Sequence, residues 1–201
     1  MRRALILVDL QHDFLPGGAL AVPDGDAVLE PAVQQIQSDA YDVVVATQDW
    51  HPPGHGSFAS VHDGQSVGTV IELHGLPQVL WPDHCVQGSH GAELHPSLPT
   101  ERIDAVFRKG TDGAVDSYSG FFDNGRRNNT GLSAWLKEKG ITDVTVLGLA
   151  TDYCVKWTAL DAQSEGFSVR VLTEASRGVE LSAGDVARAL DELRDAGVAV
   201  M

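Results

Sequence analysis

Three side chains that together could support nucleophilic catalysis each follow a short apolar run of the sequence: Asp9, Lys109 and Cys154. A carboxylate can take the proton of a thiol, and an ammonium group can stabilise the thiolate and orient the acid. Taken singly, each residue has an ordinary explanation, since acids and lysines at strand ends are usually solvated and most lone cysteines are structural. The three form a nucleophilic centre only if the fold brings them together.

Cys154 is expected at the junction between a strand and a helix. The run 143–147 predicts a buried strand, and residues 156–166 have apolar residues at helical spacing. Free amides and the helix dipole favour negative charge at such a point. A lysine ammonium group ~4 Å from the sulfur would stabilise the thiolate by ~4 kcal/mol at an effective dielectric of 20. Desolvation of the thiolate opposes both effects, so the sequence predicts a modest net lowering of the thiol pKa.

A second set of residues has metal-ligand types and spacing. Asp49 and His51 are two apart in an extended segment, so their side chains point the same way. With His84 they make two imidazoles and one carboxylate, which suits Fe(II), Mn(II) or Zn(II) and leaves coordination positions open.

Other polar residues of the same region stay open. His55 and Ser57 could reach the metal or its waters, and Cys85 is a possible soft ligand that directly follows His84. Histidine-rich loops are also often simply polar loops, so none of these three is assigned to the metal.

The apolar runs and the helical patterns alternate along the chain. Strands are predicted at residues 4–8, 42–47, 103–108, 143–147, 168–173 and 197–200. Helices are predicted over 26–38, with Asp26 as N-cap, and over 130–140, 156–166 and 185–196. This alternation predicts an α/β fold of three α/β/α layers around a mainly parallel six-stranded sheet. With the order 3-2-1-4-5-6, ligands bind at the carboxyl edge where the strand order reverses.

Length and composition suit one domain over residues 1–201, since the chain has 201 residues and is 43% apolar. Between residues 50 and 100 the periodic pattern nearly vanishes, apart from a possible minor strand at 69–73. A loop region this long inside a compact domain is usually functional, so we expect it to serve metal and substrate.

The charge and the cysteine count exclude several classes. A net charge of −14 without a basic patch argues against nucleic acid and anionic membranes as partners. Two cysteines do not make a secreted disulfide framework. The apolar run 4–8 is too short for a signal peptide or a membrane span, so a cytoplasmic protein is expected.

The motifs resemble those of the nicotinamidase/pyrazinamidase family, within the isochorismatase-like cysteine hydrolases. The resemblance rests on VDLQHDF at 8–14, QDWHP at 48–52, WPDHCV at 81–86, KG at 109–110 and ATDYCV at 150–155. It extends from residue 4 to about residue 180. The cysteine loop and the acid–lysine pair are shared by the wider superfamily, whereas the pairing of Asp-x-His with Trp-Pro-x-His-Cys is specific to nicotinamidases.

The resemblance implies a role for each matching residue. It implies Cys154 as nucleophile, Asp9 as base and later acid, and Lys109 as the third catalytic member. It implies metal binding by Asp49, His51 and His84, and a ring pocket lined by Phe14, Trp81 and Tyr118. It also implies a cis peptide at Ala150-Thr151, which would aim the amides of Ala150 and Cys154 at one oxyanion.

By the same resemblance, the expected reaction is hydrolysis of nicotinamide, and also of pyrazinamide, through a cysteine thioester. One divalent ion (Zn, Fe or Mn) would hold the pyridine nitrogen, and the protein would be a homo-oligomer. A related cysteine hydrolase of another small amide or carbamoyl compound is the main alternative. Attack by metal-bound water with a structural Cys154, and a non-catalytic binding protein, are the others. The loop 124–130 has no predicted role.

Overall fold

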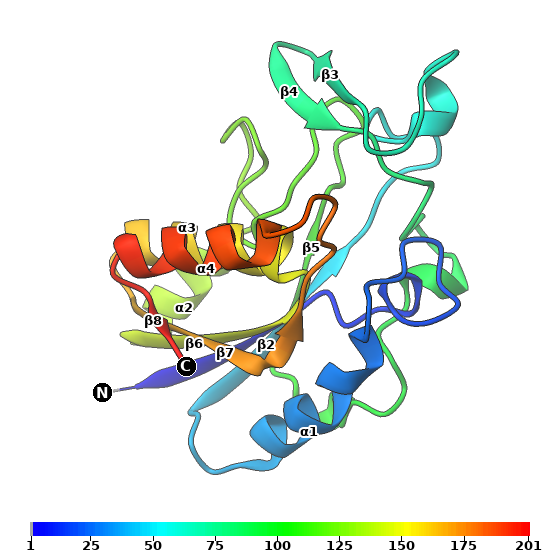
Figure 1. Cartoon of the computed structure of the whole chain (residues 1–201). Coiled ribbons are helices and arrows are strands. Elements are labelled where there is room, and N and C mark those ends of the chain that lie inside the picture. The colour runs from blue at the N-terminus through cyan, green and yellow to red at the C-terminus, as the bar shows by residue number, and fades with distance from the viewer. Residues whose placement is uncertain (1) are drawn as a thin grey trace.

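The computed structural model describes residues 2–201 and has a parallel six-stranded sheet at its centre (Figure 1). The strands are β1 (Arg3–Val8), β2 (Val43–Asp49), β5 (Ala105–Lys109), β6 (Asp143–Leu149), β7 (Ser168–Arg177) and β8 (Ala199–Val200). Their order is β5-β2-β1-β6-β7-β8, and every pairing in this sheet is parallel. In chain order this is 3-2-1-4-5-6, so the predicted topology is confirmed.

Helices cover both faces of the sheet and complete the three layers (Figure 1). One face is covered by α1 (Leu29–Gln37), and the other by α2 (Leu132–Glu138), α3 (Lys156–Ser164) and α4 (Asp185–Asp195). Alternation along β1 feeds both cores: Ile6 and Val8 pack toward α2, α3 and α4, whereas Leu5 and Leu7 pack toward α1. Each of these four side chains is at most 1% exposed, which explains the continuous apolar run of this strand.

Several predicted element boundaries are shifted, and two of them differ most. Asp26 does not cap a helix, because it lies inside a 3₁₀ turn, η2 (Gly25–Val28), that leads directly into α1. Strand β7 continues four residues beyond the predicted end at 173, because its last residues pair with the end of β6 after a bulge. The first difference arises because the chain enters α1 through a 3₁₀ turn. The second arises from pairing between strands, which local propensity does not encode.

The region 50–100 is mostly irregular, as expected. The possible minor strand is confirmed as β3 (Val70–Leu73), and it forms an antiparallel hairpin with β4 (Leu76–Val79) that stands apart from the main sheet (Figure 1). The sequence analysis missed β4, since a proline inside a run argues against a strand. The remaining short 3₁₀ turns of the chain are η1 (His12–Phe14), η3 (Ala59–Val61), η4 (His90–Ala92) and η5 (Thr100–Arg102).

The loop 124–130 is held by the carboxylate of Asp123, the residue directly before it. Its Oδ1 accepts hydrogen bonds from the amides of Gly125 and Arg127, and its Oδ2 accepts one from the amide of Asn128. Arg126 also forms an ion pair with Asp161 of α3, so the loop is fastened to the helix that follows Cys154.

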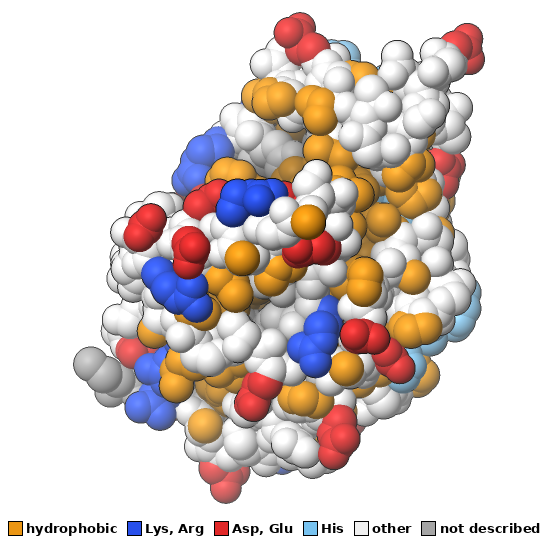
Figure 2. All heavy atoms as spheres, in the orientation of Figure 1, with side chains coloured by type: hydrophobic (Ala, Val, Ile, Leu, Met, Phe, Trp, Pro, Cys, Tyr) orange, Lys and Arg blue, Asp and Glu red, His pale blue; other side chains and the backbone are white. Residues whose placement is uncertain are grey.

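The surface carries scattered charge. Figure 2 shows acidic and basic side chains interspersed over one face, with no broad basic area on it. Within residues 2–201, no helix has both the length and the apolar character that crossing a membrane requires.

Gly148 allows β6 to approach β1 next to Asp9. Its φ is +126°, and a Cβ there would overlap the backbone of Val8. We expect Gly148→Ala to lower the free energy of unfolding by about 3 kcal/mol, measured by urea denaturation. Gly166→Ala is the control, because its φ is also positive (+93°) but a Cβ there has nothing within 4 Å. Equal losses in the two variants would contradict the overlap argument.

Candidate active site

The candidate site lies at the carboxyl edge of the sheet, where the strand order reverses between β1 and β6. Asp9 directly follows β1, Asp49 ends β2, Lys109 ends β5, and Cys154 follows β6. Parallel strands present their carboxyl ends at one edge, so residues far apart in the sequence meet here. All four residues are at most 7% exposed.

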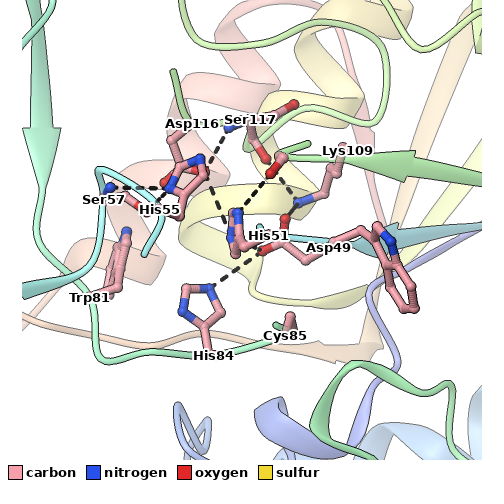
Figure 3. Close-up of polar contacts among 12 residues, drawn as sticks. Asp49, His51, His55, Ser57, Trp81, His84, Cys85, Lys109, Asp116 and Ser117 are labelled. Carbon is pink, nitrogen blue, oxygen red and sulfur yellow. Dashed lines mark hydrogen bonds and ion pairs between the residues drawn. The ribbon is translucent and has the colours of Figure 1, made fainter. Parts of the chain in front are cut away.

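The ammonium group of Lys109 lies at the centre of this cluster. Its Nζ is 2.8 Å from Oδ2 of Asp9, 3.1 Å from Oδ1 of Asp49 and 3.4 Å from Sγ of Cys154. It also donates a hydrogen bond to the carbonyl of Ser117 at 2.9 Å (Figure 3). The predicted meeting of acid, lysine and thiol is therefore present in the fold.

The charges of this cluster depend on one another. Burial by itself would lower the pKa of Lys109, but Asp49 and Asp9 raise it well above its usual value. Burial raises the pKa of Asp9, although Lys109 opposes the shift. Burial would also raise the pKa of Asp49, yet His51 and Lys109 bring it well below its usual value. Lys109 and Asp49 are thus a fixed ion pair, and Asp9 is the carboxylate that can change its protonation.

The predicted lowering of the Cys154 pKa is wrong. Burial raises the pKa of this thiol well above its usual value, Lys109 only partly opposes the shift, and Asp9 and Asp49 add to it. Desolvation of a fully buried thiolate outweighs one nearby cation when two carboxylates stand beside it. The resting group is therefore a thiol, and a thiol that acts as a nucleophile needs a base.

Cys154 lies in a π-helical turn, η6 (Thr151–Val155), directly before α3. The carbonyl of Ala150 accepts hydrogen bonds from the amides of Tyr153 and Val155, which closes this turn. The cis peptide is Leu149-Ala150, one residue before the predicted Ala150-Thr151. The motif match identified the correct loop but placed the cis bond one residue too late in it. The oxyanion hole formed by the amides of Ala150 and Cys154 remains a prediction.

Asp49, His51 and His84 form a buried group whose ligand atoms lie within 4.8 Å of one another. Oδ2 of Asp49 is 3.2 Å from Nε2 of His51 and 3.5 Å from Nε2 of His84 (Figure 3). The Nδ1 atoms of the two rings lie against carbonyls, those of Gly110 at 2.9 Å and Pro82 at 2.8 Å. Donation of each Nδ1–H to a carbonyl leaves Nε2 free to bind a metal.

The donor set fits a divalent ion. Among residues 2–201, Nε2 of His51 is a buried nitrogen whose 3.2 Å contact with Oδ2 of Asp49 does not have hydrogen-bond geometry, and such an unpaired nitrogen beside a carboxylate is expected of two ligands of one ion. Gly110 leaves room for this ring, since a Cβ there would come within 2.5 Å of Cε1 of His51. Two imidazoles and a carboxylate bind Zn, Fe or Mn, so the geometry does not select one metal.

The residues left open by the sequence are not in this ligand group. Nδ1 of His55 is 2.8 Å from Oγ of Ser57 and its Nε2 is 2.9 Å from the carbonyl of Asp112, so both ring nitrogens have protein partners. The ring of His55 lies 4.3 Å from that of His51 and supports it from the side (Figure 3). The thiol of Cys85 is buried against the carbonyl of Gly91.

Several supporting residues escaped the sequence analysis. Thr47 donates a hydrogen bond to Oδ1 of Asp9 at 2.6 Å, and the side-chain amide of Gln11 bonds to both the N–H and the C=O of Asp49. Thr47 could have been found, because it is two residues before Asp49 on a strand and so faces the same way. Asp116 is also buried, and it lies 3.9 Å from Nε2 of His51. It belongs to a polar loop, in which no spacing pattern distinguishes it from its neighbours.

A small, largely apolar cavity opens over this cluster. It is lined by Phe14, Leu20, Asp49, Trp81, His84, Asp116, Tyr118, Ala150, Tyr153, Cys154 and Val179. The indole N–H of Trp81 donates to Oη of Tyr118 at 3.2 Å, and the ring of Trp81 meets that of Tyr153 edge-on at 4.9 Å. The three aromatic residues predicted to form a ring pocket thus share one cavity with the thiol and two residues of the metal-site candidate.

Comparison with known proteins gives consistent results along the whole chain. The family model of the isochorismatase domain matches residues 3–201. A nicotinamidase of Escherichia coli (strain K12) is 54% identical over 197 residues, covering 97% of this chain and 92% of the relative.

Two solved structures extend the comparison to three dimensions. A nicotinamidase/pyrazinamidase of Acinetobacter baumanii superimposes with a TM-score of 0.95 at 44% identity, covering 100% of this chain and 95% of the other. A pyrazinamidase of Pyrococcus horikoshii in complex with zinc superimposes with a TM-score of 0.81 at 36% identity, covering 100% and 99%.

Protons should compete with metal at His51. Burial alone would lower its pKa, but Asp49 raises the pKa of His51 to about 9. In the metal-free protein this charge stabilises the fold fully below the unfolded pKa of ~6.5, and the stabilisation is lost as pH rises through about 9. Metal binding requires the neutral ring, so metal affinity should fall about tenfold per pH unit below 9. Calorimetric zinc titrations between pH 6.5 and 8.5 test this prediction, and a pH-independent affinity would contradict it.

Proposed function

The chain belongs to the isochorismatase family, and we propose that it works as a nicotinamidase, hydrolysing nicotinamide to nicotinate and ammonia and also accepting pyrazinamide. The observation that carries the proposal is the position of Lys109. Its Nζ is 3.4 Å from the thiol of Cys154 and 3.1 Å from Asp49 of the metal-site candidate. This arrangement supports the proposal, because it would hold a nucleophile and a ring anchor a short distance apart.

The cavity suits a flat aromatic amide. Phe14, Trp81 and Tyr118 would enclose the pyridine ring by apolar and edge-on contacts, and Cys154 lies where the carboxamide would rest. Fixing the ring in this way orients the amide carbon toward the sulfur, which removes much of the entropic cost of the reaction.

The acylation half-reaction begins with proton transfer from Cys154 to Asp9. The buried carboxylate has its pKa raised by burial, which makes it a competent base for a thiol whose pKa is also raised by burial. The sulfur then bonds to the amide carbon, and the carbonyl π electrons move onto oxygen. The amides of Ala150 and Cys154 would stabilise that oxyanion by hydrogen bonds.

The intermediate collapses as Asp9 returns its proton to the departing nitrogen. The C–N bond breaks, ammonia leaves and a thioester with Cys154 remains. Asp9 then takes a proton from water as the water oxygen attacks the thioester carbon. The C–S bond breaks, the product leaves as the carboxylic acid and releases its remaining proton to water as nicotinate forms, and the proton held by Asp9 returns to the sulfur, which restores both groups.

Lys109 stays charged through this cycle, since its pKa is raised well above the usual value by Asp49 and Asp9 against the effect of burial. It would stabilise the thiolate when the proton is on Asp9, and the Asp9 carboxylate when the proton is on the sulfur. The negative charge would therefore have a cationic partner whichever of the two groups holds the proton.

Asp49, His51 and His84 would hold one divalent ion. When bound, that ion supplies a Lewis-acid contact for the ring nitrogen of the substrate. The zinc complex of the Pyrococcus horikoshii relative supports zinc, and iron or manganese would suit the same donors.

Three broader expectations remain proposals. We infer that residues 1–201 act as a single hydrolase domain, in which the region 50–100 serves metal and substrate. Cys85 and Cys154 are free thiols, which suits the reducing cytoplasm. Exposed apolar side chains such as Val106 and Trp157 would be covered in a homo-oligomer.

Cys154→Ala should abolish ammonia release from nicotinamide, with kcat falling at least about a thousandfold, because the thioester cannot form. Cys85→Ala is the matched control: it removes the other buried thiol, which is outside the cavity, and should keep kcat within about tenfold. A coupled ammonia assay measures both variants. Retained turnover in Cys154→Ala would favour attack by metal-bound water instead.

Benzamide should be a poor substrate, because it has the shape of nicotinamide but lacks the ring nitrogen. We expect kcat/KM to be at least about a hundredfold lower than for nicotinamide. The position on the proposed metal ion that the ring nitrogen would occupy stays unfilled with benzamide. Pyrazinamide keeps a nitrogen at that place and should fall within about tenfold of nicotinamide. Equal kcat/KM for benzamide and nicotinamide would point to the runner-up, a hydrolase of other small amides.

A further inference from the structure

We propose that His12, His90 and Glu93 form a second binding site, on the surface, for a divalent transition-metal ion such as zinc. The ligand atoms of these three residues lie within 4.8 Å of one another. None of the three belongs to the group of Asp49 and its neighbours, so the site is separate from the candidate active site.

The geometry of the group already resembles a ligand set. The rings of His12 and His90 have their centroids 4.1 Å apart, and Nδ1 of His90 is 2.8 Å from Oε2 of Glu93. As an exposed ion pair, this last contact would contribute little to stability. A bound cation would replace the proton between these two atoms and would also draw in His12.

A third imidazole lies within reach. The ring of His95 is 5.2 Å from that of His12, and its Nδ1 is 2.8 Å from Oγ of Ser97. That bond leaves Nε2 of His95 available. Three imidazoles and one carboxylate on one small surface are the nitrogen and oxygen donors that zinc and its neighbours prefer.

Backbone contacts hold the two segments that carry these side chains together. The amide of His12 donates to the carbonyl of Glu93 at 3.2 Å, and the amide of His95 donates to the carbonyl of Leu10 at 2.9 Å. Gln11 lies in antiparallel register with the residue between Glu93 and His95. The donors are therefore positioned by a short two-stranded contact, which reduces the entropic cost of collecting them around an ion.

Charge and location favour a cation here. The chain carries a net charge of −14, which attracts cations in general. Figure 2 shows histidine side chains gathered along the right flank of the molecule. The turns η1 and η4, which carry His12 and His90, are in contact, so the site bridges two turns rather than occupying one flexible loop.

The segment that carries His12 also serves the candidate active site. Phe14, in η1, lines the cavity, and the carboxylate of Asp13 accepts a hydrogen bond at 2.7 Å from the amide that follows His84. An ion bound at the surface would crosslink this segment to the one that carries His90. It should therefore raise the melting temperature, because a ligand that binds only the folded state stabilises it by mass action.

The test counts zinc rather than activity. Purified protein is stripped of metal, dialysed against low micromolar free zinc and analysed for bound metal. We expect two equivalents in the wild type and one in His12→Ala/His90→Ala. His51→Ala should also retain one, which assigns the two equivalents to different places. His74→Asn is the matched control: it removes an exposed histidine elsewhere, and asparagine tolerates the φ of +48° at that position.

Circular dichroism confirms that each variant is folded, and Glu93→Gln provides a milder variant that should weaken the second equivalent. A zinc count in His12→Ala/His90→Ala equal to that of the wild type would overturn the proposal, whatever the candidate active site binds. Because bound zinc is the readout, these outcomes do not depend on whether nicotinamide is the substrate.

Discussion

The buried ammonium group of Lys109 is the interaction on which the rest of the site depends. It touches two carboxylates and a thiol within 3.4 Å, and its side chain is fully buried. Charges removed from water are tolerated only when each has a close partner. The proposed nucleophile, its proposed base and one candidate metal ligand are therefore tied to a single cation, and none of them can be moved without disturbing the other two.

The sheet explains why this position holds a lysine. Strand β5 is separated from β6 by β2 and β1, and at about 4.8 Å per strand the two lie about 14 Å apart. A long side chain from one end and an inward-leaning loop from the other are needed to close that distance. Lys109 provides the first, and the π-helical turn that carries Cys154 provides the second.

The irregular region 50–100 contains only a two-stranded hairpin and short turns, yet it supplies several residues of the candidate site. It contributes His51 and His84 to the metal-site candidate and Trp81 to the cavity wall. Its order comes from hydrogen bonds to the sheet edge: the side chain of Gln11 holds the backbone of Asp49 and the carbonyl of Ala92 at the same time. A fully bonded buried amide of this kind fixes a loop more firmly than apolar contact alone.

The amino-acid sequence was sufficient for the alternation of strands and helices, for placing Asp9, Lys109 and Cys154 at one edge of a parallel sheet, and for the spacing of the Asp-His-His group. Those features follow from short-range periodicity and from the rule that parallel strands end at one edge. The raised pKa of Cys154, the supporting contacts of Asp116 and the place of the cis peptide emerged only in the folded molecule. Desolvation and side-chain contacts are set by atoms from segments distant in sequence, and no local pattern encodes their distances.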